Sequence, residues 1–217
     1  MSRSEPVQQD SLLTRIRDRI QREKNALVIR RVRRQIPDHG FSVISQNCIG
    51  GVLYHDLGAP FLTPTVNLFI PAKDFLRLCA DLKRYMQLPL CVTMGENWPV
   101  GMLGDVRIEF MHYASCEEAE AAWARRAARI RYDRIVIVGT DRDGFDDEAF
   151  AAWQQLPFPK VLFTANSAYA QHEDSVYLPR FSENGAIADL IPGRAFYKQG
   201  KLVCAVNTAC RSKEDSH

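Results

Sequence analysis

Four consecutive β-branched residues, Ile135-Val136-Ile137-Val138, constrain the fold more than any other stretch of this 217-residue chain. A short, wholly apolar run is typical of a strand buried on both faces, as in a parallel sheet. A second run, Val161-Leu162-Phe163-Thr164, follows a segment with a helical pattern. Strands that alternate with helices predict an α/β fold, and we expect a three-layer open sheet with an additional N-terminal basic amphipathic helix.

The spacing of apolar residues and turn signals predicts the remaining elements. Further strands are expected at 41–44, 65–70, 90–93 and 106–111, and helices at 52–57, 71–86, 115–130 and 146–156. A hairpin about Gln199-Gly200 is expected over 195–203, followed by a frayed tail. We therefore predict three parts: a basic helix or tail at 1–39, one α/β domain at 40–206 and a C-terminal tail at 207–217.

Positive charge is concentrated at the start of the chain. The first 39 residues hold ten Lys or Arg and five Asp or Glu, whereas the whole chain has a formal charge of +2. From Ser11 onwards, apolar residues recur at helical spacing with arginines between them. Residues 11–34 are therefore a candidate for peripheral membrane association. The alternative is a helix that docks on the domain with a solvated arginine face. Nucleic acid is not expected as a partner, because this stretch has no aromatic residue and the remaining chain is acidic.

Composition excludes several classes of protein. Hydrophobic residues make up 46% and charged residues 25%, as in ordinary globular chains. The sequence has no apolar run of membrane-spanning length and no secretory signal at its N-terminus, so we expect a cytoplasmic protein; a peripheral location at the inner face of the membrane is the alternative. The six cysteines have no zinc-ligand spacing, so we expect free thiols and no zinc site. Motifs for dinucleotides, P-loop phosphates and the serine nucleophile elbow are missing, and no cofactor is indicated.

Cys48 is the first candidate for chemistry, because sites of open α/β sheets lie at the carboxyl ends of the strands. A helix N-terminus beside Cys48 would lower the pKa of its thiol. His112 could then act as the base that deprotonates Cys48, and Asp141 could orient His112. Asn47 could donate to an oxyanion, and a glycine pair could let substrate approach the backbone. This pair is Gly50 and Gly51. The alternative is a buried packing cysteine and a hydrogen-bonded histidine at a strand end.

Asp141-Arg142-Asp143 is the second candidate. It follows a buried strand and has the spacing of the DxD motif, whose carboxylates hold Mg²⁺ or Mn²⁺ in nucleotide-sugar transferases. Acidic triplets are also common in turns, where Asp143-Gly144 would form the turn and Asp146 would cap a helix. Arg125 and Arg126 could grip a phosphate or a carboxylated sugar, or form a solvated helix face.

Tyr113 is a further candidate for a carbohydrate site, because sugars stack on aromatic rings; aromatic residues near turns also simply pack.

Several stretches together resemble a bacterial family, domain-of-unknown-function family 1919, which is associated with exopolysaccharide and capsule biosynthesis. They run in order through most of the chain: 45–51, 63–69, 99–105, 110–113, 123–126, 141–144 and 156–158. The resemblance implies an α/β fold and a role in surface-polysaccharide synthesis, but it carries over no catalytic residues. Isoleucine at 49 and phenylalanine at 145 depart from the family pattern.

Three functions remain open. The first is a sugar-modifying acyltransferase with Cys48 as nucleophile, which would use a saccharide and an activated-sugar or acyl-donor substrate. The second is a metal-dependent glycosyl or phosphosugar transferase that uses Asp141 and Asp143. The third is a non-catalytic accessory protein that binds saccharide or a membrane enzyme. We favour the first.

Overall fold

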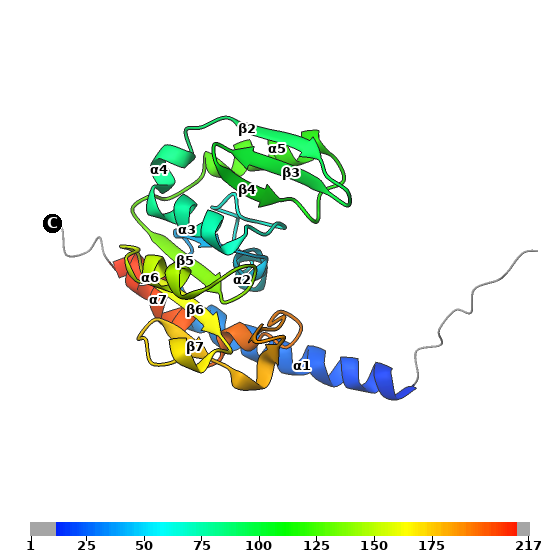
Figure 1. The fold of residues 1–217 in the computed structure, drawn as a ribbon. Helices are drawn as coiled ribbons and strands as arrows, with labels where there is room; N and C mark the ends of the chain where they lie inside the picture. Colours follow the sequence, from blue (N-terminus) through cyan, green and yellow to red (C-terminus); the bar gives the residue numbers. More distant parts are fainter. Residues whose placement is uncertain (1–11, 212–217) are drawn as a thin grey trace, which may run out of the picture.

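The computed structural model describes residues 12–211 and has the mixed α/β fold that the sequence predicts (Figure 1). Its strands are β1 (Ser42–Ser45), β2 (Leu90–Met94), β3 (Pro99–Leu103), β4 (Val106–Glu109), β5 (Ile135–Thr140), β6 (Lys160–Thr164), β7 (Ser175–Tyr177), β8 (Ser182–Glu183) and β9 (Ala186–Ile187). Its α-helices are α1 (Leu12–Gln35), α2 (Ile49–Leu57), α3 (Ala72–Ala80), α4 (Leu82–Tyr85), α5 (Cys116–Ala127), α6 (Asp147–Gln154) and α7 (Lys201–Arg211), with short 3₁₀ helices at 167–169, 179–181 and 195–197.

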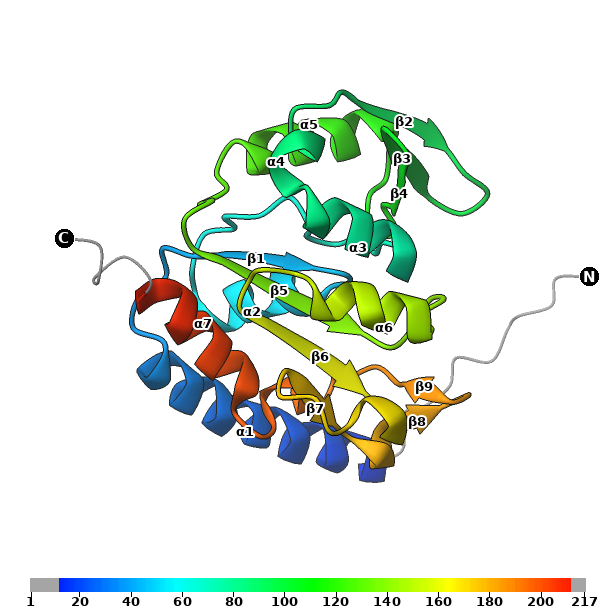
Figure 2. The same cartoon turned by 60° about the vertical axis from the view of Figure 1, so that its left-hand side comes forward.

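The central sheet is parallel, with strand order β1-β5-β6-β7. Every residue of β5 is buried, as the apolar sequence predicts. Alternate residues enter different cores: Val136 and Val138 pack with α1, α2 and α7, whereas Ile135 and Ile137 pack with α3, α6 and the small antiparallel sheet. Figure 2 shows α1 and α7 on one side of these strands and α6 on the other. This burial on both faces explains why the run contains no polar residue.

Side chains complete the outer edge of β1. The Val43 amide donates to the Tyr54 hydroxyl (3.1 Å), and that hydroxyl donates to the Phe41 carbonyl (2.7 Å). The Ser45 amide donates to Thr65 Oγ1 (2.9 Å). Residues 65–70 therefore lie beside β1 without forming the predicted strand; only Phe69 makes a bridge, to Glu109 of β4. Side-chain hydroxyl groups thus bond the backbone amides of β1 at this edge, where the sequence of residues 65–70 predicted another strand.

The opposite edge of the sheet, at β7, is completed in the same manner. Lys201 Nζ donates to the carbonyls of Glu173 and Ser175 (both 2.7 Å), and Gln199 Nε2 donates to the Tyr177 carbonyl (3.1 Å). Lys201 is the first residue of α7 and Gln199 lies in the turn before it, so the C-terminal segment covers this edge of the sheet.

The C-terminal predictions were wrong. In place of a hairpin over 195–203, a 3₁₀ turn at 195–197 leads into α7, which continues through Arg211. Leu202, Val206 and Ala209 recur at helical spacing and are buried against the sheet. The boundary at 207 therefore falls inside a helix, and of the predicted tail only 212–217 lies outside the described residues.

Two internal predictions also need correction. The helix expected over 71–86 is divided at Asp81, whose extended φ of −139° separates α3 from α4. Strand β3 was not predicted; it pairs with both β2 and β4 in an antiparallel sheet. Its Pro99 and Gly101 weaken the strand pattern.

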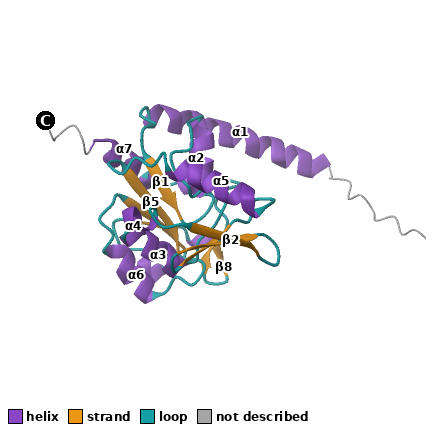
Figure 3. Cartoon of the chain, turned by 90° about the horizontal axis from the view of Figure 1, so that it is seen from above, coloured by secondary structure: helices purple, strands orange, loops and turns teal. Residues whose placement is uncertain are grey.

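Helix α1 belongs to the domain along its second half. Val32 and Ile36 are buried in the core with α2 and α7, and Arg33 Nε donates to the Asp56 carbonyl (2.6 Å). Helix α1 ends at Gln35, close to the predicted boundary at residue 39, and its second half packs in the same core as the α/β domain. Figure 3 shows the first turns of α1 extending past the rest of the domain. Ser11, the predicted N-cap, lies outside the described residues.

Candidate functional site

A pocket of about 460 Å³ lies at the carboxyl ends of β1 and β5. The loops after β1, β4 and β5 contribute Asn47, Cys48, His112 and Asp143, so four predicted site residues meet in one cavity. The sheet-edge rule of α/β folds thus pointed to loops that meet at one cavity. Its complete lining is Asn47, Cys48, Ile49, Phe69, Met111, His112, Thr140, Arg142, Asp143, Ala188, Asp189, Leu190 and Ile191.

The surroundings of Cys48 favour its protonated thiol. Cys48 precedes α2 and is half-buried, with Sγ 3.9 Å from the Leu68 carbonyl. Burial raises the pKa of the thiol above its usual value, and the negative charge of Asp189 raises it further. Both favour the protonated form, whereas a nucleophilic cysteine needs the thiolate. The predicted lowering of this pKa is therefore corrected to a rise.

The first turn of α2 does not provide an oxyanion hole through its first two amides. The Ile49 amide donates to Asn47 Oδ1 (3.1 Å), and the Gly50 amide donates to Ser45 Oγ (3.2 Å). Asn47 thus caps the helix with its oxygen, while its Nδ2 lies 3.5 Å from Thr140 Oγ1 at the pocket wall. Of the Asn47 side chain, the amide nitrogen, which carries a second proton, remains able to donate to a ligand.

Gly50 and Gly51 bring α2 close to its neighbours and lie away from the pocket lining. A Cβ on Gly50 would lie 2.8 Å from the Ser45 Cβ, and one on Gly51 would lie 3.2 Å from Val66 Cγ1. Gly50 therefore permits tight packing of α2 against β1, and Gly51 permits tight packing of α2 against the loop at Val66; neither residue lines the pocket where substrate was expected to approach the backbone.

Asp141 has a structural role. Its Oδ2 accepts from Thr164 Oγ1 (2.7 Å) and the amides of Ala165 (2.9 Å) and Asn166 (3.3 Å), and its Oδ1 accepts from the Ile187 amide (2.7 Å). The carboxylate is buried and joins the ends of β5 and β6 to β9. Because both oxygens are engaged there, these contacts do not support the predicted orientation of His112 by Asp141.

Asp143 differs from Asp141 because its side chain lines the pocket. The residue has a left-handed backbone (φ 59°), and its carbonyl accepts from the Ala72 amide at the start of α3 (3.0 Å). Desolvation by the surrounding protein raises the pKa of its carboxyl group, partly offset by Arg142. With Asp141 engaged elsewhere, the triplet offers one free carboxylate. Among residues 12–211, no cluster of three His, Cys, Asp or Glu side chains is suited to hold a metal ion.

The remaining predicted binding residues lie outside the pocket. Arg126 donates to the Tyr113 hydroxyl, which in turn donates to the Val66 carbonyl (2.8 Å). Arg126 also lies over the Phe61 ring, at 5.3 Å from its centroid. Tyr113 is buried, and Arg125 is exposed on α5. Arg126 and Tyr113 thus hold α5 against the loop before α3.

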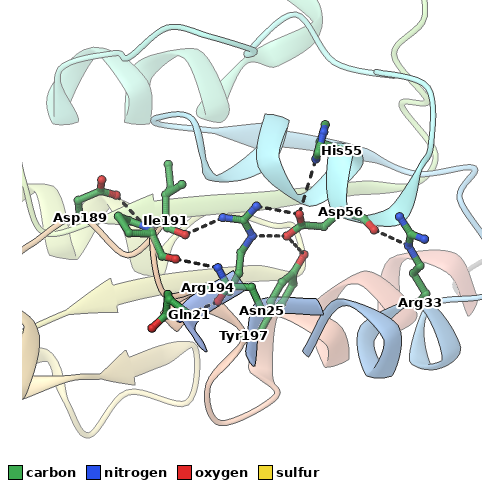
Figure 4. Close-up of polar contacts among 10 residues, drawn as sticks. Gln21, Asn25, Arg33, His55, Asp56, Asp189, Ile191, Arg194 and Tyr197 are labelled. Carbon is green, nitrogen blue, oxygen red and sulfur yellow. Dashed lines mark hydrogen bonds and ion pairs between the residues drawn. The ribbon is translucent and has the colours of Figure 1, made fainter. Parts of the chain in front are cut away.

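The fourth wall of the pocket, residues 188–191, was not predicted. Figure 4 shows how it is held: Arg194 donates to both carboxylate oxygens of Asp56 (2.6 and 3.0 Å) and to the Ile191 carbonyl (2.7 Å). The Tyr197 hydroxyl donates to the same carboxylate (3.1 Å). Asp56 is 1% exposed, so this is a buried ion pair between α2 and the wall. The two partners are 138 positions apart, and no local pattern relates them.

The same wall contacts α1. Gln21 Nε2 donates to Asn25 Oδ1 (2.8 Å), and Asn25 Nδ2 donates to the Pro192 carbonyl (2.8 Å; Figure 4). The wall is therefore fixed from two directions, by the buried Asp56 of α2 and, through the adjacent Pro192, by Asn25 of α1.

Comparisons with known proteins agree with the resemblance found in the sequence. The family model described as "Domain of unknown function (DUF1919)" matches residues 18–206. An uncharacterized protein of Haemophilus influenzae is 34% identical over 202 residues, which cover 90% of this chain and 98% of that protein. The match begins inside α1 and ends inside α7, so it includes every strand and the whole pocket. The chain belongs to the DUF1919 family.

Proposed function

We propose that this protein is a sugar-modifying transferase of surface-polysaccharide synthesis, and that the pocket holds the sugar whose hydroxyl group accepts the transferred group. The polysaccharide setting comes from the family resemblance. The observation that carries the proposal is the meeting of polar side chains from four separate loops around an apolar floor.

The composition of the pocket suits a neutral sugar. A sugar ring presents hydroxyl groups at its rim and C–H groups on its faces, so it needs paired donors and acceptors beside an apolar surface. Asn47 and Arg142 supply donors, and the carboxylates of Asp143 and Asp189 supply acceptors. Phe69 is an apolar part of the lining. The two carboxylates and the engaged amides of α2 disfavour a substrate whose phosphate would sit in this part of the pocket.

His112 and Asp143 are the candidates for acid–base chemistry. A carboxyl group with a raised pKa in a pocket is a common feature of catalytic sites. In the proposed step one of these groups takes the proton of the sugar hydroxyl, the oxygen attacks the donor group, and the leaving group departs with its electron pair. The acyl group that the sequence analysis favoured can be transferred directly in this way, without a thioester on Cys48.

Sugar binding tests this proposal. We would titrate the protein with neutral monosaccharides and their nucleoside-diphosphate forms and follow the binding by ligand-observed NMR. Asp143→Asn should weaken sugar binding by at least about tenfold, because a hydrogen bond to a charged group contributes roughly 1.5–3 kcal/mol. Asp81→Asn, at the exposed junction of α3 and α4, is the matched control. No binding by the wild type, or equal binding by Asp143→Asn, would contradict the proposal.

A covalent step remains a second candidate, because Cys48 and His112 line the same pocket. Once a donor is identified, Cys48→Ala separates the two mechanisms. Direct transfer predicts that this variant keeps most of its turnover and its sugar binding. Loss of turnover with intact sugar binding would instead assign the nucleophile to the thiol.

A further inference from the structure

Helix α1 has apolar residues on two opposite faces. One face carries Val32, which is buried in the core, and Ile36, directly after the helix, is buried beside it. The other carries Ile16, Ile20 and Leu27, which are 48%, 47% and 66% exposed. At 3.6 residues per turn these three side chains lie within roughly 40° of one another, and on the side of the helix opposite to the core. We call Ile16, Ile20 and Leu27 the outer stripe.

Positive charge surrounds the outer stripe. Helix α1 contains Arg15, Arg17, Arg19, Arg22, Lys24, Arg30, Arg31, Arg33 and Arg34, against only Asp18 and Glu23 as acidic residues. Arg19 pairs with Glu23 on the surface (3.3 Å), and Arg33 donates to the Asp56 carbonyl. Lys24, Arg30 and Arg31 are exposed and lie beside the stripe. The exposed face thus combines an apolar centre with a basic border.

We propose that the outer stripe of α1 docks this protein on an anionic membrane surface, lying in the interface without crossing it. Apolar side chains enter the boundary of the acyl chains while flanking basic groups contact anionic headgroups, which is the pattern of helices that lie on membranes. No helix within residues 12–211 is long and apolar enough to span a bilayer.

The charges favour a membrane over the other occupants of such a face. A second copy of the chain would bring two sets of basic side chains together, which is unfavourable. Nucleic acid would leave the apolar centre of the stripe without a partner, because α1 has no aromatic residue on which a base could stack.

Docking would also orient the pocket. The inner face of α1 holds the pocket wall through Asn25 and Pro192, so helix and wall move together. The first turns of α1 lie at the end of the domain where β8 and β9 lie (Figure 2). A docked helix therefore brings this end of the domain towards the lipid. The docking proposal itself does not depend on the proposed sugar chemistry.

Vesicle flotation with the full chain tests the docking. The probes are vesicles of phosphatidylcholine alone and of phosphatidylcholine mixed with phosphatidylglycerol. We expect binding to the anionic vesicles that weakens as salt is added. Lys24→Gln/Arg30→Gln/Arg31→Gln should lower the partition coefficient on the order of a hundredfold, since each basic residue near an anionic surface contributes about fivefold.

Two further variants make the result specific. Ile16→Ser/Ile20→Ser/Leu27→Ser should lose at least tenfold in binding while its circular dichroism stays unchanged, because the three side chains are exposed. Arg125→Gln/Arg129→Gln/Arg180→Gln removes the same number of exposed charges elsewhere and should bind like the wild type. Equal binding to neutral vesicles, full binding by the stripe variant, or a dimer in solution that this variant converts to a monomer would each overturn the proposal.

Discussion

At the scale of single residues, neighbours in sequence have different roles because their surroundings differ. Asp141 and Asp143 are two positions apart in one turn. The first is buried among four donors, and the second lines the pocket with a raised carboxyl pKa. From their spacing in the sequence, the two carboxylates appeared as equivalent candidates for metal ligands. The difference depends on the amides of residues 165, 166 and 187, whose position follows from the whole sheet, so the sequence could not reveal it.

The raised pKa of the Cys48 thiol can be tested directly. Asp189 lies in the opposite pocket wall, and its charge disfavours the thiolate. We expect Asp189→Asn to lower the thiol pKa and to speed alkylation of Cys48 at a fixed, mildly alkaline pH. The rate is read residue by residue by mass spectrometry. The exposed Cys91 should react at the same rate in both proteins, and an unchanged rate at Cys48 would show that Asp189 has no electrostatic effect there.

At the scale of elements, the close contact of α2 with β1 predicts that a methyl group added at position 50 of α2 lowers the stability of the protein. Alanine normally stabilises a helix relative to glycine by about 1 kcal/mol. At position 50 the new Cβ would lie 2.8 Å from the Ser45 Cβ, and overpacking of this kind costs roughly 1–3 kcal/mol. We expect overpacking to dominate, so Gly50→Ala should lower the free energy of unfolding in urea.

Gly193→Ala is the matched control for this change. Its Cβ would meet only Gln21 Nε2, at 4.0 Å, and its backbone does not have a positive φ. We expect its stability to stay within roughly 0.5 kcal/mol of the wild type. A Gly50→Ala protein as stable as Gly193→Ala would mean that α2 can move away from β1.

Helices and strands were predicted correctly where the local sequence pattern is strong. The strands β1, β5 and β6 and the helices α5 and α6 were predicted because apolar periods and side-chain caps agree there; Ser115 and Asp146 do accept from the amides three residues on. The pattern of α7 was misread because Gln199-Gly200 suggested a hairpin turn. Both residues do have positive φ, but they precede a helix. The pocket wall at 188–191 depends on the pairing of Asp56 with Arg194, which no local signal reports.

At the scale of the whole molecule, buried tyrosines should limit stability in alkali. Burial raises the phenol pKa of Tyr54 and Tyr197, and burial together with a hydrogen bond to Asp147 raises that of Tyr169 to about 12. In the unfolded chain these groups ionise near pH 10. Above that pH the unfolded state holds fewer protons than the folded state. The contribution to stability is therefore complete below about pH 10 and declines as the pH rises towards 12.

The measurement is urea unfolding at about pH 8 and about pH 10.5. The wild type should lose stability between them, and Tyr169→Phe should lose less, because one ionising phenol is removed. The difference between the two proteins isolates this tyrosine from lysines that titrate in the same range. Identical losses would show that the Tyr169 phenol does not contribute to the pH dependence.

The completed edges of the parallel sheet have a consequence for how the protein behaves in a crowded solution. A strand from another chain can add to a sheet only where backbone donors and acceptors are free, and such addition is the first step of many aggregates. At β1 the amides of Val43 and Ser45 are bonded to Tyr54 and Thr65, and at β7 the carbonyls of Ser175 and Tyr177 are bonded to Lys201 and Gln199. Strand addition would first have to displace these side chains, so we infer that local unfolding, of α7 above all, controls entry into aggregation.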